Sequence, residues 1–247
     1  MNLELKGKNV FVTGGTKGIG RAIAEAFVQE GAKVAVCART KPEHWPQEIA
    51  VVTGDVTNAY ERERIFADVT AIIGPIDILI NNAGGSNGES IEKTDMEEFY
   101  EAFELNYFSA VHFSKLVLPA MKSSQEGAII HISSIFGREA GGKATYNNAK
   151  AALISFTKAW ADEVASEGIR VNSLAPGSIL HPTGNWQRRL DENPEKIQAF
   201  IDNEIPSGRF GTPEEVANVV VFLASSKASW VKGTSLQVDG GQSKANF

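Results

Sequence analysis

The chain has 247 residues, of which 43% are hydrophobic and 22% are charged, and its 24 basic and 30 acidic side chains give a net charge of −6. The apolar content excludes a disordered chain, and the excess of acidic over basic residues argues against binding to the phosphates of a nucleic acid. A single cysteine, Cys37, excludes an internal disulfide and a cysteine-based zinc cluster, and the four histidines are too scattered to indicate a metal site.

No targeting or membrane segment is predicted. Residues 1–8 are polar and mixed in charge, and no apolar segment of a signal peptide follows them. No apolar run approaches the roughly 18 residues that a membrane-spanning helix requires. These features predict a cytoplasmic protein that binds neither membrane nor nucleic acid.

Short apolar runs alternate with segments of helical periodicity along the chain. Strands are predicted at residues 10–12, 33–37, 50–53, 77–80, 128–132, 169–174 and Ser235–Val238. Helices are predicted at residues 18–30, 60–73, 95–121, 144–166 and 213–223, with a candidate break near Pro119. Strands that are apolar throughout and separated by helices are typical of a parallel sheet covered on both faces. The sequence therefore predicts an α/β fold, a single doubly wound Rossmann-type domain over residues 1–247 with a parallel seven-stranded sheet.

A glycine-rich turn joins the first predicted strand to the first helix, with the sequence Thr13-Gly14-Gly15-Thr16-Lys17-Gly18-Ile19-Gly20. Glycines in this place let the backbone turn sharply and approach a pyrophosphate, which then meets the helix N-terminus. A nucleoside-triphosphate P-loop is excluded because Arg21 and Ala22 stand where a lysine and a serine or threonine are required. The turn therefore predicts a dinucleotide site. Its predicted contacts are Gly14, Thr16, Lys17, Gly18 and Ile19.

The end of the second predicted strand bears on the choice between NADP(H) and NAD(H). An acidic side chain usually meets the ribose hydroxyls of NAD(H) there, but this strand ends in Cys37-Ala38-Arg39, with no acid before Glu43. Arg39 can form a fork to a 2′-phosphate, and Lys17 adds a second positive charge. Both could instead be ordinary solvated charges. Their joint occurrence favours NADP(H), without strict exclusion of NAD(H).

Three polar side chains are candidates for the chemistry. Tyr146 and Lys150 are four residues apart in a predicted helix and so share one face. A phenol is a poor acid or base at neutral pH, and a neighbouring ammonium lowers its pKa, as acid–base catalysis needs. Ser134 lies at the end of the fifth predicted strand, where reacting groups gather in α/β sheets.

The one irregular stretch is residues 177–211, which contains several prolines and glycines and a short predicted helix at residues 195–203. It follows the sixth predicted strand, at the sheet edge where ligands bind. A long connection in this place predicts a lid over a ligand, and the alternative is a surface excursion without function.

Together these motifs resemble the classical branch of the short-chain dehydrogenase/reductase family, near the 3-oxoacyl-carrier-protein reductases and the glucose and carbonyl reductases. The resemblance runs nearly end to end. It rests on Thr13-Gly14-x-x-x-Gly18-Ile19-Gly20, Asp55-Val56, Asn81-Asn82-Ala83-Gly84, Ser134, Tyr146-x-x-x-Lys150, Pro176-Gly177, Arg209-Phe210-Gly211-x-Pro213-Glu214-Glu215-Val216-Ala217 and Val238-Asp239-Gly240-Gly241.

The resemblance implies a role for each matching residue. Tyr146 is the expected general acid in carbonyl reduction and the base in the reverse reaction. Lys150 is expected to hold the nicotinamide ribose and to lower the pKa of Tyr146. Ser134 is expected to bond the substrate oxygen, and Asn106 to anchor a water that links Lys150 to solvent. The implied dinucleotide contacts are Gly14, Gly18, Ile19, Asp55, Val56, Asn82, Ala83, Gly84, Pro176 and Gly177.

The sequence also departs from the family pattern. Ser134 precedes Tyr146 by 12 residues, one fewer than is usual, and Ser133 would restore that spacing but fits the Ser-x-x-Gly pattern badly. Ser134 is therefore preferred. Residues 41–48 are too short for the usual crossover helix, and Trp45 within them either covers the adenine or, as we favour, plugs the exposed sheet face. Asn106, Asn81 and Asn172 also have a purely structural interpretation, as buried amides that satisfy backbone groups.

The sequence thus predicts an NADP(H)-preferring reductase or alcohol dehydrogenase that acts on a small ketone or secondary alcohol. Segments around Lys122 and Glu167 are poor in the basic residues expected for docking an acidic carrier protein, which favours a small free substrate. The resemblance implies a homotetramer, with a dimer as the alternative. Two other functions stay open, a non-catalytic dinucleotide sensor and a lyase or epimerase on the same fold.

Overall fold

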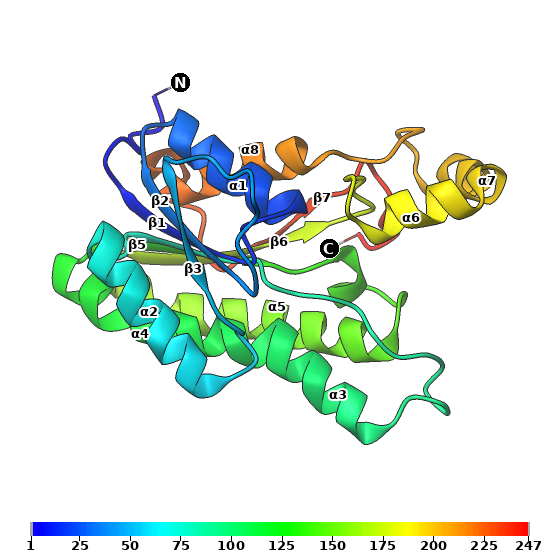
Figure 1. The fold of residues 1–247 in the computed structure, drawn as a ribbon, viewed down its shortest axis with the longest axis horizontal. Helices are drawn as coiled ribbons and strands as arrows, with labels where there is room; N and C mark the ends of the chain where they lie inside the picture. Colours follow the sequence, from blue (N-terminus) through cyan, green and yellow to red (C-terminus); the bar gives the residue numbers. More distant parts are fainter. Residues whose placement is uncertain (1, 247) are drawn as a thin grey trace.

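The computed structural model describes residues 2–246, and in this part of the chain seven parallel strands form one sheet (Figure 1). The spatial order is β3-β2-β1-β4-β5-β6-β7. The strands are β1 Asn9–Thr13, β2 Lys33–Ala38, β3 Ile49–Thr53, β4 Ile78–Asn81, β5 Gly127–Ile132, β6 Ile169–Pro176 and β7 Ser235–Val238. Each begins or ends within two residues of its predicted bounds, and the predicted doubly wound parallel sheet is confirmed.

Helices cover both faces of the sheet, α1 and α8 on one and α2, α4 and α5 on the other (Figure 1). The central strands are buried on both sides because two apolar cores flank them. Ile23 of α1 and Val216 of α8 lie in one core, and Phe113 of α4 packs edge-on against Phe11 of β1 in the other. The helices are α1 Gly18–Gln29, α2 Ala59–Ile73, α3 Met96–Phe103, α4 Ser109–Ser124, α5 Ala144–Val164, α6 Asn185–Glu192, α7 Pro194–Glu204 and α8 Pro213–Ala224.

The predicted helix at residues 95–121 differs from the observed structure. It is interrupted by a π turn, Glu104–Phe108, which separates α3 from α4. The predicted break near Pro119 is wrong, since α4 continues through Pro119 to Ser124. Val117 and Met121 flank the proline and are fully buried in the core, and this packing outweighs the backbone hydrogen bond that the proline removes.

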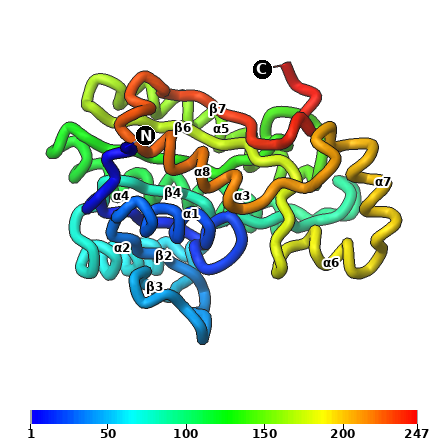
Figure 2. The backbone as a smooth tube through the Cα atoms, turned by 90° about the horizontal axis from the view of Figure 1, so that it is seen from above, coloured from blue at the N-terminus to red at the C-terminus, as the bar shows by residue number. Residues whose placement is uncertain are grey.

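The topology places a site at one edge of the sheet. The chain runs outward from β1 to β3, then returns to place β4 on the other side of β1. At such a reversal the loops after the two central strands diverge and leave a crevice beyond their carboxyl ends. Figure 2 shows α6 and α7 together at one end of the molecule, where they follow the end of β6.

Two connections bear on this crevice. Residues 41–48 form no helix, as predicted, and Trp45 packs against the core beside α1, with its indole N–H donating to the Ile49 carbonyl at 2.8 Å. The interpretation of Trp45 as a plug of the sheet face is therefore confirmed. Residues 177–211 contain α7 close to the predicted short helix, and also α6, which was not predicted because its sequence is largely polar. Within residues 2–246, no helix is both long and apolar enough to cross a membrane.

Candidate active site

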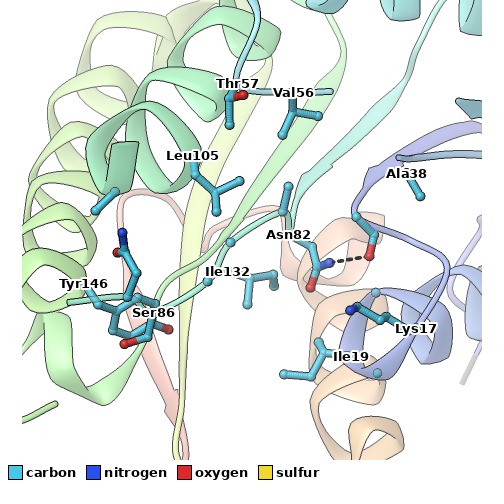
Figure 3. Close-up of a pocket in the computed structure, with 18 of the residues that line it drawn as sticks. Lys17, Ile19, Ala38, Val56, Thr57, Asn82, Ser86, Leu105, Ile132 and Tyr146 are labelled. Atoms are coloured by element: carbon cyan, nitrogen blue, oxygen red, sulfur yellow. Dashed lines mark hydrogen bonds between the residues drawn. The ribbon is translucent and has the colours of Figure 1, made fainter. Parts of the chain in front are cut away.

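A cavity of about 1120 Å³ lies beyond the carboxyl ends of the strands. Figure 3 shows Lys17 and Ile19 of the glycine-rich turn on one side of it and Tyr146 with Ser86 on the other. The structure brings together around it nearly all of the residues that the sequence singles out. Those that line it are Gly14, Thr16, Lys17, Gly18, Ile19, Arg39, Asp55, Val56, Asn82, Ala83, Gly84, Ser134, Tyr146, Lys150, Pro176 and Gly177.

The glycine-rich turn is shaped to accept a pyrophosphate. Gly14 and Gly18 adopt positive φ angles of 63° and 53°, which disfavour other residues. A Cβ on Gly20 would lie 2.4 Å from both the Gly14 carbonyl oxygen and Asn82 Nδ2, so α1 can start this close to the turn only with glycine. Lys17, the N-cap of α1, makes no side-chain capping bond, and the first N–H groups of α1 therefore stay free for an anion. These features fit a dinucleotide.

Contacts between β1 and the end of β4 hold the turn in place. Asn82 Nδ2 donates to the carbonyl oxygens of Thr13 and Gly14, both at 3.0 Å, and the second of these bonds is dashed in Figure 3. The Thr13 hydroxyl accepts the backbone N–H groups of Asn82 and Ala83, also at 3.0 Å. Asn82 therefore shapes the cradle as well as lining it.

The two cations proposed to select the cofactor both border the cavity. Arg39 and Lys17 are both exposed side chains that line it. Beside them, Asp55 accepts the backbone N–H and the hydroxyl of Thr57, at 2.9 and 2.8 Å. The Thr57 backbone bond is the main reason that the pKa of Asp55 is lowered, with a smaller contribution from Arg39. Asp55 is thus ionised at neutral pH, and Arg39 is a cation near enough to act on it.

Helix α5 positions Tyr146 and Lys150 at the centre of the cavity. The Lys150 ammonium lies 5.6 Å from the centre of the Tyr146 ring and donates to the Ile132 carbonyl at 2.7 Å. Burial lowers the pKa of Lys150 to about 7. Burial also raises the pKa of Tyr146, and a hydrogen bond with Ser134 acts in the opposite direction. The net shift is upward and Lys150 is not among its causes, so the expected lowering of the Tyr146 pKa by Lys150 is not seen in this structure. The phenol therefore holds its proton at neutral pH, as a proton donor must.

The two serines after β5 have different partners. The Ser133 hydroxyl donates to the Lys150 carbonyl at 3.0 Å, so it fastens α5 to the sheet. The Ser134 hydroxyl accepts the Phe136 N–H at 3.1 Å and lies beside the Tyr146 phenol. These contacts leave the Ser134 hydroxyl hydrogen-bonded to the phenol, whereas the Ser133 hydroxyl proton is committed to the backbone.

Asn106 lies behind the cavity, in the π turn. Its amide donates to the carbonyls of Gly85 and Ala102, both at 2.9 Å, and accepts the Gly85 N–H at 3.0 Å. A Cβ on Gly84 would lie 2.8 Å from Asn106 Oδ1 and 3.1 Å from Lys150 Nζ, so both side chains meet at this glycine. The π turn is what aims the amide there, and such turns are frequent at functional sites.

Several other buried polar residues have a structural role, because their hydrogen bonds are made within the protein. His131 contacts the hydroxyls of Thr157 and Ser114, and burial lowers its pKa to about 3, so it stays neutral. Asn81 donates to Ser114, and Asn172 bonds the backbone of residues 231 and 234.

The cavity also has lining residues that sequence reasoning did not assign. These are Ser86, Asn87, Tyr100, His181 and Asn185, among others. They come from the loop after β4, from α3 and from the start of residues 177–211. Their types and spacing carry no motif, and the one available signal was their position just after the Asn82-Ala83-Gly84 and Pro176-Gly177 motifs.

Comparison with known proteins places this geometry in context. The protein family described as "Enoyl-(Acyl carrier protein) reductase" matches residues 14–243. The 3-oxoacyl-[acyl-carrier-protein] reductase FabG of Escherichia coli is 40% identical over 250 residues, with 98% of each chain covered. A tropinone reductase homolog of Arabidopsis thaliana is 39% identical over 255 residues, covering 99% of this chain and 94% of that protein.

Solved structures give the same picture. L-sorbose reductase from Gluconobacter frateurii, crystallised with NADPH and L-sorbose, superposes with a TM-score of 0.91 at 34% identity, covering 99% of this chain and all of that one. Aldohexose dehydrogenase from Thermoplasma acidophilum, in ligand-free form, gives a TM-score of 0.89 at 34% identity, covering 99% and 98%.

Proposed function

The chain belongs to the short-chain dehydrogenase/reductase family, and we propose that Tyr146, Lys150 and Ser134 carry out its reaction on a small ketone or secondary alcohol. It is an oxidoreductase, in which a bound nicotinamide cofactor supplies or accepts the hydride. The relatives named by an activity are reductases and a dehydrogenase, which does not favour a non-catalytic sensor, a lyase or an epimerase.

The observation that carries the proposal is the meeting of these three side chains in one cavity with a glycine cradle. The Ser134 hydroxyl and the Tyr146 phenol hydrogen-bond the substrate oxygen and so orient the carbonyl. Tyr146 gives its proton to that oxygen during reduction and takes it back during oxidation. The buried Lys150 ammonium stabilises the negative charge that then develops on the phenolate. Asn106 fixes the backbone at Gly85 beside Lys150.

We assign the cofactor as NADP(H), with Arg39 and Lys17 binding its 2′-phosphate. Both cations line the cavity, and no acidic side chain follows β2 before Glu43. The L-sorbose reductase, at 34% identity, was crystallised with NADPH.

Replacing Arg39 by aspartate is expected to move the preference from NADPH towards NADH, because the fork to the phosphate is replaced by a repelling carboxylate. Calorimetric titration should show the ratio of the two dissociation constants shifting by at least about tenfold, or about 1.4 kcal/mol. Lys196→Asp makes the same change of charge on the exposed face of α7, away from the cavity, and should leave the ratio as in the wild type. An unchanged ratio in Arg39→Asp would remove Arg39 from the phosphate site.

The proposed substrate is a small free molecule. Lys122, in the last turn of α4, and Glu167, just after α5, form an ion pair at 2.8 Å, but both precede the strands β5 and β6 and so lie at the sheet edge opposite the cavity, where they do not bear on the docking of a carrier protein. FabG is named for a carrier-bound substrate, whereas L-sorbose reductase was crystallised with a free sugar. We further propose that residues 177–211 act as the lid over this substrate, and that the protein is a cytoplasmic homotetramer.

The experiment that tests the proposal is NADPH oxidation measured over a panel of free ketones and ketoses, with a 3-oxoacyl carrier protein in parallel. Turnover of a free ketone with a kcat/KM above that of the carrier-bound substrate is the expected result. Preference for the carrier-bound substrate would contradict the substrate class, and NADPH binding without turnover of any carbonyl would contradict the reaction itself.

A further inference from the structure

His181 connects the glycine-rich turn to the start of α6. Its Nε2 atom lies 2.9 Å from the position that a Cβ would take on Gly18 and 2.7 Å from that position on Gly184. The imidazole ring thus packs between two glycines, in a gap that closes as soon as either carries a side chain. Gly18 begins α1, and Gly184 is the N-cap of α6. The ring therefore lies at the N-terminal ends of two helices at once.

The surroundings of His181 are electropositive. Neither α1 nor α6 has a side-chain cap, so the free N–H groups of both helices give their ends a partial positive charge. Lys17, in the glycine-rich turn, is the charged side chain that acts on the ring, while Asn185 and Trp186 from α6 are neutral. A doubly charged anion would therefore meet favourable charges on this cavity wall, from two helix ends, a lysine and an imidazole.

We propose that His181 binds the cofactor pyrophosphate and that it takes up a proton as it does so. The proposal rests on the proposed dinucleotide function and adds a residue to it. In residues 2–246 the ring's hydrogen-bond partner is the Thr183 hydroxyl, 3.3 Å from Nδ1, which leaves Nε2 to donate to a phosphate oxygen. The Thr183 hydroxyl can donate to Nδ1 or accept from it, and the neutral ring donates from Nε2 only when Nδ1 accepts, whereas the imidazolium donates from both nitrogens at once.

The electrostatics give the direction of the proton linkage. Burial, and to a lesser extent Lys17, lowers the pKa of His181, so the imidazole is neutral at pH 7 before the cofactor binds. A pyrophosphate within hydrogen-bond distance favours the imidazolium and raises that pKa again. The complex then holds more protons than the free protein, and the cofactor must bind more tightly as the pH falls from 8 to 6.

The same contact links the cofactor to the lid. His181 lies at the start of residues 177–211, and its ring packs against Gly184 immediately before α6. A phosphate held jointly by α1, His181 and the first turn of α6 would therefore draw α6 onto the glycine-rich turn. A lid fastened in this way would depend on the protonation of one side chain.

The test is calorimetric titration of the wild type, His181→Asn and the control His44→Asn with NADPH and with NADH. Asparagine can still donate to a phosphate but does not titrate, and His44 is an exposed histidine outside the cavity. Titrations at pH 6 and 8, in two buffers of different ionisation enthalpy, give the dissociation constant and the number of protons taken up. NADH lacks the 2′-phosphate, so it separates the pyrophosphate contribution from that of Arg39 and from the titration of the 2′-phosphate itself.

For the wild type and His44→Asn we expect proton uptake on binding and a dissociation constant several-fold lower at pH 6 than at pH 8, with either cofactor. His181→Asn should take up fewer protons on binding, because the contribution of His181 is gone, and its dissociation constant should depend less on pH. Equal uptake and equal pH dependence in His181→Asn and the wild type would overturn the proposal while leaving the dinucleotide function intact. Failure of the wild type to bind either cofactor would overturn both. If His181→Asn does not fold, as judged by thermal melting, His181→Gln is compared in the same way.

Discussion

Replacing Tyr146 by phenylalanine is expected to lower kcat by about 10²- to 10⁴-fold, the usual contribution of a positioned acid or base. The phenylalanine ring keeps the packing of α5 but has no proton to give, and the substrate oxygen loses one of its two donors. The glycine-rich turn and Arg39 lie at the other side of the cavity, so the dissociation constant for NADPH should stay within a few-fold of the wild type. Steady-state kinetics on a carbonyl substrate, together with calorimetric titration, measure both quantities.

A matched control separates this effect from a general loss of tyrosine. Tyr60, on α2, is 85% exposed and does not line the cavity, so Tyr60→Phe should leave kcat as in the wild type. Wild-type turnover by Tyr146→Phe would show that another group protonates the substrate. Loss of NADPH binding in that variant would instead show that the phenol mainly supports the cofactor site.

Replacing Lys150 by methionine is expected to abolish catalysis and to stabilise the free protein at neutral pH. Burial lowers the pKa of Lys150 from 10.5 to about 7, which corresponds to a cost of about 5 kcal/mol for ionising the group in the folded protein. Methionine removes this cost with a side chain of similar length. It also leaves the Ile132 carbonyl without its donor, at a cost of about 1–3 kcal/mol. The net expectation is a free energy of unfolding that is higher by a few kcal/mol at pH 7.

The pH dependence gives this prediction its sign. Between pH 7 and 10.5 the unfolded chain keeps a proton on Lys150 that the folded protein releases, so the stability of the wild type rises with pH in this window. Below pH 7 both states are ionised and the cost is fully present. In urea unfolding at pH 7, 8 and 9, the free energy of unfolding of the wild type should therefore rise relative to that of Lys150→Met by about 1 kcal/mol per pH unit.

Lys158 provides the control on the same helix. Its ammonium is exposed and pairs with Asp162. Lys158→Met should therefore show neither a higher free energy of unfolding at pH 7 nor a changed dependence of that free energy on pH. If Lys150→Met were less stable than the wild type at pH 7, and its free energy of unfolding changed with pH in the same way, the buried ammonium would not destabilise the folded protein. A stabilised but inactive Lys150→Met protein would mean that the fold tolerates this charge for the sake of the reaction.

Much of the architecture followed from local patterns. Apolar runs such as Val10 to Val12 predict buried strands because parallel strands are covered on both faces, and the alternation with helices leads to the observed sheet. The glycine-rich turn, and the spacing of Tyr146 and Lys150, were readable because one helix turn or one loop contains the whole motif. Short-range geometry is encoded in neighbouring residues, so the sequence by itself determined the fold class and the centre of the cavity.

What the tertiary structure decided depends on segments far apart in the chain. Pro119 remains inside α4 because the core on both sides of it outweighs a local preference. The π turn that places Asn106 against Gly84 has no sequence signature, and the same is true of the contact between His181 and Gly18. The lowered pKa of Lys150 likewise arises from burial by several elements at once. Packing and desolvation are sums over distant neighbours, and no local pattern of residues contains them.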